Sequence, residues 1–268
     1  MIKRLSILML VLVAGCMTHA PVIPSRYQIG IPQADAATNE PIAGQVYLGR
    51  VYKSYTIPIV AHTNNANMDP DSPAYIDVAT NRWPTRRTHV DLSLDGGSNY
   101  TRRIGYGVQF DDARVQADLV WSPPDDYTLM TTNAVLRAQN LDGSPWPQRS
   151  PAMPYDIKPG CFPQSSIFSI VGATIDSPSG GILWRGESTT IQWRQVGGGS
   201  VYDLYWLTPT SQGIDVSHWL TTISNVVMGA NSKVISLNVP AAPEVRLAIV
   251  SASDQWIVGY SQTFTVDP

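Results

Sequence analysis

The chain has 268 residues with a formal net charge of −3, and 43% of the residues are hydrophobic whereas only 15% are charged. That length accommodates one or two domains, and an acidic balance without any long basic run argues against a nucleic-acid partner. Glu and Lys, both strong helix formers, occur at only three and four positions, whereas the strand-favouring Val, Ile, Thr, Tyr and Trp are plentiful. The composition therefore predicts an all-β protein.

The N-terminus has the pattern of an export signal. The basic pair Lys3-Arg4 precedes an apolar run of about nine residues, 5–13, which is shorter than the roughly 20 residues of a membrane-spanning helix. The run ends in Leu-Val-Ala-Gly-Cys at positions 12–16, which resembles the lipobox of bacterial lipoproteins. The resemblance implies that residues 1–15 are a lipoprotein signal peptide and that the Cys16 thiol receives the lipid, so that labelled palmitate should be incorporated there.

A lipid on Cys16 makes the membrane of the cell envelope a partner of this protein. Met17 follows the cysteine at the position where lipoproteins retained in the inner membrane usually have Asp, which favours the outer membrane. An ordinary signal peptide cut near Ala20 is the alternative. Residues 16–44 are rich in proline and lack periodicity, which predicts an extended linker.

Residues 45–172 are predicted to form a first β-sandwich. Apolar residues alternate with others over 45–60, 89–94 and 134–138, as expected of strands with one buried face. The loop 63–73 has Asn and Asp at alternate positions, a spacing that can surround a calcium ion. The loop lacks the central Gly and the closing Glu of an EF-hand, so a turn-rich loop without a metal is the preferred interpretation.

The run from Ser93 to Gly97, Ser-Leu-Asp-Gly-Gly, is followed by an aromatic residue at Tyr100. It looks like a strand–turn–strand motif of bacterial immunoglobulin-like domains. It also looks like the Asp box of sialidase-type propellers, but a propeller needs the box in every blade and one copy is present. The first resemblance implies that Asp95 closes the turn through its side chain while the glycines supply positive φ.

A proline-rich stretch, 140–164, interrupts this strand pattern before it resumes at 167–170. We predict an insertion that the sandwich does not need in order to close. Trp146, Tyr155 and Phe162 lie in it and are candidates for contacting a partner protein, because Trp and Tyr are enriched at interface hot spots. The alternative is a strap that packs over the edge of its own domain.

The stretch 175–193 alternates apolar and polar residues between turn clusters. Its order is apolar-x-apolar, Ser-Pro, Gly, apolar-Trp, Gly, Ser/Thr, apolar-x-Trp. This order resembles the opening strands of bacterial immunoglobulin-like domains, which also occur in Ser/Thr-rich cell-wall proteins of fungi. The resemblance implies a second immunoglobulin-like sandwich over 173–268, and Trp193 is expected in its core.

Four segments of the second half match four of the first in the same order. The chain is therefore predicted to hold two tandem immunoglobulin-like β-sandwiches after the signal peptide and the linker. The segments 202–207, 236–240, 245–249 and 263–266 match 89–94, 119–123, 135–138 and 167–170.

The common catalytic motifs are absent from the sequence: there is no Gly-x-Ser-x-Gly, no His-Glu-x-x-His, no phosphate-binding loop and no Cys-x-x-Cys. The pairs Asp111-Asp112 and Asp125-Asp126 could supply the two carboxylates of a glycoside hydrolase, but adjacent Asp residues in loops are usually only solvated. His89 and His218 are expected to be structural. We therefore expect a protein that is not an enzyme and uses no cofactor and no metal, with glycoside hydrolysis as a remote alternative.

Tryptophan is concentrated in the second half of the chain. Tyr205 and Trp206 are neighbours on a predicted strand and must face opposite sides. Because exposed aromatic rings on a sandwich can stack on sugar rings, Trp219 and Trp256 are candidates for binding a glycan; filling the core is the alternative. Overall the sequence favours a non-catalytic envelope lipoprotein, a structural or binding module that contacts another envelope or surface protein, with carbohydrate binding second.

Overall fold

The computed structural model describes residues 28–29, 32–34, 45–49, 54–60, 87–109, 116–139, 141, 143, 146–149, 157–162, 164–209 and 215–268. Within these ranges the chain is built of strands, with one short 3-10 helix, η2 (Tyr127–Leu129). No helix in this part of the chain is long and apolar enough to span a membrane. The predicted signal peptide, most of the predicted linker and the 63–73 loop lie outside the described residues. The described linker residues 28–29 and 33–34 pair with the strand 55–60, so the prediction of an extended linker is wrong for these residues.

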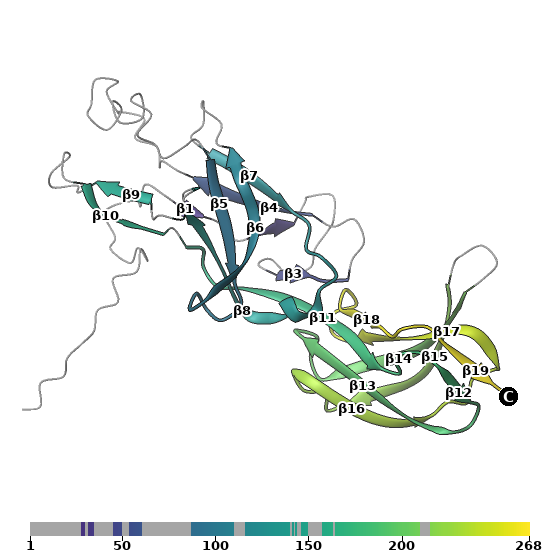
Figure 1. Ribbon diagram of the computed structural model, residues 1–268. Helices are drawn as coiled ribbons and strands as arrows, with labels where there is room; N and C mark the ends of the chain where they lie inside the picture. The colour runs from purple at the N-terminus through teal and green to yellow at the C-terminus, as the bar shows by residue number, and fades with distance from the viewer. Residues whose placement is uncertain are drawn as a thin grey trace, which may run out of the picture.

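The first domain is a sandwich of two sheets around one apolar core (Figure 1). In one sheet β4 pairs with β1, β2 and β7, and in the other the order is β6-β5-β8-β11, with β3 parallel to β11. The strands of the first sheet are β1 (Gln28–Ile29), β2 (Gln33–Ala34), β4 (Tyr55–Val60) and β7 (Gln116–Trp121). Those of the second are β3 (Gln45–Tyr47), β5 (Arg87–Ser93), β6 (Tyr100–Gln109), β8 (Thr131–Gln139) and β11 (Phe168–Ser177).

The second domain has the same two-layer arrangement. One of its sheets has the order β16-β13-β11 and the other β12-β19-β17-β14-β15, with β18 added to β17. The bounds are β12 (Ile182–Trp184), β13 (Ser188–Val196), β14 (Val201–Pro209) and β15 (Asp215–Ser224). They continue with β16 (Gly229–Ser236), β17 (Ala242–Ser251), β18 (Val258–Tyr260) and β19 (Phe264–Asp267).

The two domains repeat one topology. In the first, β5 pairs with β6 and β8, and β4 pairs with β7; in the second, β14 pairs with β15 and β17, and β13 pairs with β16. In each domain the last strand also pairs in parallel with an early strand, β11 with β3 and β19 with β12. The predicted fold class, two tandem immunoglobulin-like β-sandwiches, is confirmed.

A serine in the last connection of each domain shows how close the repeat is. The Leu136 N–H donates to Ser165 Oγ at 3.0 Å, and the Leu247 N–H donates to Ser261 Oγ at 2.8 Å. In both cases the serine N–H returns a bond to the same leucine carbonyl at 3.0 Å. These matched bonds align Leu136 with Leu247. Because Leu92 pairs with Leu136 and Trp206 with Leu247, Leu92 corresponds to Trp206, and the predicted match of 89–94 with 202–207 is wrong by one residue.

This pair of serines gives a prediction. Because Ser165→Ala leaves the buried N–H of Leu136 without its acceptor, we expect it to lower the free energy of unfolding by about 1–3 kcal/mol. Ser261→Ala should do the same through Leu247. Amide hydrogen exchange will check this, since each variant should accelerate exchange mainly in the domain that contains the substituted serine. Equal acceleration in both domains would contradict the assignment of one serine–leucine bond to each domain.

The domains are joined by strand β11, which belongs to both. Its residues 169–171 pair with β3, and its residues 172–177 pair with β13, so the boundary predicted between 172 and 173 falls inside one strand. The Tyr47 side chain leaves β3 to pack in the core of the second domain. Its hydroxyl donates to Asp254 Oδ2 at 2.8 Å, in a buried position. The junction is therefore a packed interface.

The predicted core tryptophan and the predicted Asp95 turn are both present. Trp193 is 2% exposed and lies in the second core. Asp95 Oδ1 accepts hydrogen bonds from the Ser93 hydroxyl at 2.6 Å and from the Asn99 N–H at 2.8 Å. Gly96 and Gly97 follow with φ of 74° and 90°, the left-handed region that the resemblance implied.

These bonds to the ionised carboxylate lower the pKa of Asp95 from 3.8 to about 2, with the Ser93 hydroxyl as the largest cause. Because the pKa is lower in the folded state, the turn is stabilised fully above the unfolded value and this contribution is lost as the pH falls toward 2. We expect the free energy of unfolding of Asp95→Asn to fall less steeply than that of the natural protein as the pH is lowered from about 4 to 2. Urea titrations between about pH 4 and pH 2 will measure it, and parallel curves for both proteins would contradict it.

Candidate functional site

The side chains of three predicted site residues lie outside the described part of the structure. Cys16 and Tyr155 lie outside the described residues, and of Trp146 only the backbone is described. Trp146 begins β9 (Trp146–Arg149), which pairs with β10 (Ile157–Cys161), so the predicted insertion contains a two-stranded hairpin. The side chain of Phe162 is half-buried, with its ring 4.7 Å from the Arg137 guanidinium.

The two tryptophans predicted to bind a glycan differ in their surroundings. Trp219 lies on β15, the last strand of its sheet, and is 60% exposed. Trp256 lies in the turn between β17 and β18, where it is half-buried and packs against the second core. Trp219 is therefore available to a ligand, and Trp256 supports the domain.

The strand register brings Trp219 together with two other aromatic residues. Tyr205 pairs with Trp219 on one side and with Ala248 on the other, and Ala248 pairs in turn with Tyr260. Residues directly opposite in register point to the same side of a sheet. Trp219, Tyr205 and Tyr260 therefore form one line across β15, β14, β17 and β18, which we call the aromatic row.

The aromatic row faces outward. Gly259, beside Tyr260, faces the domain interior, because a Cβ on it would meet the Ala173 carbonyl carbon at 2.7 Å. Tyr260 must point the opposite way, and it is 41% exposed. With strands about 4.8 Å apart, Trp219 and Tyr205 are one strand spacing apart and Tyr260 lies two spacings further on. The small Ala248 separates the two tyrosines.

Polar groups border the row on both sides. The Arg246 guanidinium lies 4.9 Å from the centre of the Tyr260 ring. On the other side the Thr222 hydroxyl donates to Asp203 Oδ1 at 2.5 Å. On the opposite side of these strands Trp206, which packs against the second core, stacks on His218 with 4.5 Å between ring centroids and so links β14 to β15. The result is a firm surface of aromatic rings with hydrogen-bonding groups at its margins.

Of the carboxylates considered for glycoside hydrolysis, Asp125 and Asp126 lie in the described part of the first domain. Asp126 caps η2 through the Thr128 N–H and forms an ion pair with Arg102 at 3.0 Å. Its hydrogen bonds from Thr128 lower its pKa, which suits a structural carboxylate. Asp111 and Asp112 lie outside the described residues, and in the described part of the chain no group of three or more acidic, His or Cys side chains could hold a metal.

Sequence reasoning found Trp219 but missed Tyr205 and Tyr260 as its partners. Adjacent residues on a strand face opposite sides, so either Tyr205 or Trp206 had to be outside. The tertiary register, with an irregularity between Leu204 and Tyr205, decides that Tyr205 is the outward one. Tyr260 lies on a three-residue strand whose pairing partner a single sequence does not reveal.

No family model and no curated protein matches this chain. Among solved structures it is similar to the polymeric Ig receptor ectodomain of a teleost fish, with 13% identity and a TM-score of 0.25 over 84% of this chain and 96% of that chain. A marsupial T cell receptor matches with 12% identity and a TM-score of 0.26 over 84% and 71%. E. coli alpha-2-macroglobulin matches with 8% identity and a TM-score of 0.27, and the match covers 92% of this chain and 17% of that protein. The immunoglobulin-like assignment rests on the strand order described above.

Proposed function

We propose that this protein is a non-catalytic binding module, anchored to the bacterial cell envelope by a lipid on Cys16, which holds another envelope protein on its aromatic row. The observation that carries the proposal is the row itself. Trp219, Tyr205 and Tyr260 share one outward face, and Arg246 lies at its end. Trp, Tyr and Arg are the residue types most enriched at interface hot spots.

The energetics favour binding over a purely structural role for this face. A Trp that is 60% exposed leaves apolar surface in water that a partner would bury. The tyrosine rings add contact area with few rotatable bonds, so little side-chain entropy is lost on association. The lipid restricts the protein to the membrane surface, which raises its effective concentration near membrane-associated partners.

The test is capture of partners from detergent-solubilised envelopes by the full-length lipidated protein. We expect Trp219→Ala combined with Tyr260→Ala to weaken capture by at least about tenfold, or about 1.4 kcal/mol, while the fold is retained. Trp184→Ala is the matched control, because Trp184 is 52% exposed on β12, at the opposite edge of the same sheet. Equal capture by all three proteins would reject the row as the binding face.

The anchor is tested separately. Incorporation of labelled palmitate and sedimentation with membranes should both be lost in Cys16→Ser. If this variant incorporates palmitate and sediments like the natural protein, the lipid anchor is rejected. That result would not affect the proposed binding face, which the capture experiment tests separately.

Carbohydrate binding through the same row is the second candidate. The specific observation in its favour is that the outward rings of the row are bordered by the Thr222–Asp203 pair and by Arg246, an arrangement that can stack on a sugar and bind its hydroxyls. Retention on peptidoglycan and other insoluble polysaccharides separates the two. Retention that Trp219→Ala abolishes, without any captured protein, would favour the glycan.

A further inference from the structure

The row of the second domain has a counterpart at equivalent positions of the first domain. There Arg103 pairs in register with Asp91, Asp91 with Arg137, and Arg137 with Gln164. The matched serine bonds align these four positions with Trp219, Tyr205, Ala248 and Tyr260. The first domain thus presents a charged row, Arg103, Asp91, Arg137 and Gln164, where the second presents rings.

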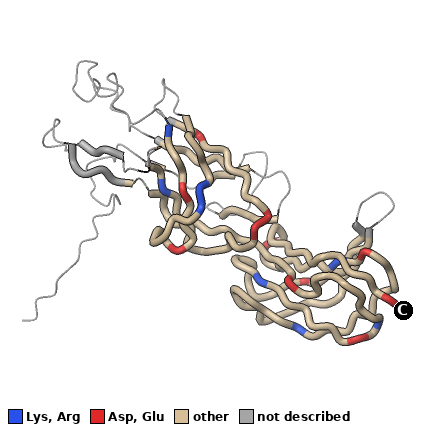
Figure 2. The backbone as a smooth tube through the Cα atoms, in the orientation of Figure 1, with Lys and Arg blue, Asp and Glu red and all other residues tan. Residues whose placement is uncertain are grey.

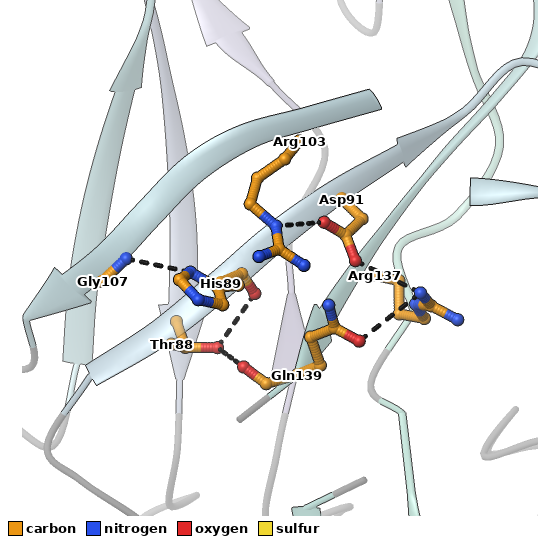
Figure 3. Close-up of polar contacts among 7 residues, drawn as sticks. All are labelled: Thr88, His89, Asp91, Arg103, Gly107, Arg137 and Gln139. Atoms are coloured by element: carbon orange, nitrogen blue, oxygen red, sulfur yellow. Dashed lines mark hydrogen bonds and ion pairs between the residues drawn. The ribbon is translucent and has the colours of Figure 1, made fainter. Parts of the chain in front are cut away.

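One carboxylate holds two guanidinium groups in the charged row (Figure 3). Asp91 is only 5% exposed, and it accepts from Arg103 Nε at 2.8 Å and from Arg137 Nη2 at 3.2 Å. Arg137 is also flanked by the Tyr100 ring at 4.0 Å and the Phe162 ring at 4.7 Å. Both guanidinium groups are therefore fixed before any ligand arrives, and the trio keeps a charge of +1.

Donors dominate the surface beside this trio. His89 Nδ1 accepts the Gly107 N–H at 3.1 Å, so the neutral ring carries its own proton on Nε2. The Tyr106 ring, 76% exposed, lies 5.7 Å from the Arg103 guanidinium and 5.9 Å from the His89 ring. Among the described residues Arg103 donates a hydrogen bond only from its Nε, to Asp91. The outer N–H groups of its guanidinium are therefore left to bind a ligand.

We propose that this surface, formed by Arg103, Arg137, His89 and Tyr106, binds the carboxylates of an acidic, extended segment of a partner protein. A guanidinium fork matches a carboxylate in two parallel hydrogen bonds, and an Arg already fixed by Asp91 loses little entropy in forming them. Figure 2 marks both blue basic and red acidic positions on the first domain, whereas the trio of Arg103, Asp91 and Arg137 has a net charge of +1 in a chain of net charge −3. A local positive surface on an acidic protein favours an acidic partner.

The strand order favours a peptide as the source of the carboxylates. Arg103 and Tyr106 both lie on β6, the last strand in its sheet order, and the far edge of β6 pairs with no described strand. An extended peptide can lie along such an edge and place alternate side chains over the outer face. Tyr106 offers that peptide an apolar contact beside the charges.

This site is separate from the aromatic row. The sheet that carries it continues through β11 into β13 and β16, whereas the row lies on the other sheet of the second domain. A failure of one site therefore leaves the other untouched, and each can be tested with the other intact.

The test is titration of the full-length protein with a capped hexaglutamate peptide at low ionic strength, followed by calorimetry. We expect saturable binding that weakens as salt rises and that Arg103→Gln reduces about tenfold. Arg194→Gln is the matched control, because Arg194 is an exposed arginine whose Nε lies 2.8 Å from Asp176 Oδ2 in the second domain. Tyr106→Ala should also weaken binding, with its unfolding curve checking that the fold is kept.

Three results would overturn the proposal. The first is no binding of hexaglutamate, and the second is an equal loss in Arg103→Gln and Arg194→Gln. The third is equal or tighter binding of an oligouronate or of inorganic phosphate, since either would assign the surface to a different anion. A capped hexaglutamine peptide should not bind under the same conditions.

Discussion

Replacing Tyr47 by alanine should lower the free energy of unfolding by about 3–5 kcal/mol, the range for removing a large buried aromatic side chain. Tyr47 is 2% exposed, and although it extends from a strand of the first domain it packs in the core of the second. The substitution leaves a cavity at the junction and removes the donor to Asp254. Urea unfolding followed by tryptophan fluorescence will measure the loss.

Tyr47→Phe is the matched variant, because it keeps the ring and removes only the hydroxyl. It leaves Asp254 Oδ2 without that donor, which we expect to cost about 1–3 kcal/mol. If Tyr47→Ala proved no worse than Tyr47→Phe, the ring would contribute little to the packing of the two domains. That result would contradict the description of the junction as a packed interface.

Gly259→Ala should destabilise the second domain by about 3 kcal/mol, the upper end of the usual range for overpacking. The added Cβ would approach the carbonyl carbon of Ala173 to 2.7 Å and the nitrogen of Thr174 to 2.8 Å, and backbone atoms cannot rotate away. Gly172→Ala is the control, since its closest neighbour, the Leu48 Cβ at 3.2 Å, belongs to a side chain. Thermal unfolding of both variants will decide, and equal effects would contradict the close approach of β18 to β11.

Much of the fold could be predicted from the sequence because it depends on local patterns. The alternation of apolar and polar residues predicted the strands that contain Val90, Leu92 and Leu204, and the structure shows that all three side chains are buried. The Ser-x-Asp-Gly-Gly run predicted the turn that Asp95 closes. The repeat was recognisable because each copy must bury one face of the same strands. The match of 202–207 with 89–94 was wrong by one residue because it paired the ends of the two segments. A shift of one residue exchanges the two faces of a strand, and it set the buried Tyr202 against His89, which lies on the outer face.

The candidate site was only partly predictable because it depends on contacts between distant strands. Tyr205 and Tyr260 are far apart in sequence and share a face only through Ala248. The charged row was missed for the same reason. Arg103, Asp91 and Arg137 come from three strands. The sequence around each residue does not indicate that the Asp91 carboxylate binds both guanidinium groups.

The central claim, that the aromatic row is the face that holds a partner protein, is tested most directly by site-specific photo-crosslinking in living cells. A benzophenone amino acid in place of Trp219 should yield one discrete adduct with an envelope protein. The same group in place of Trp184, at the opposite edge of the sheet and 52% exposed, should yield none. Adducts of equal yield from both positions, or none from position 219 in a folded protein, would contradict the account.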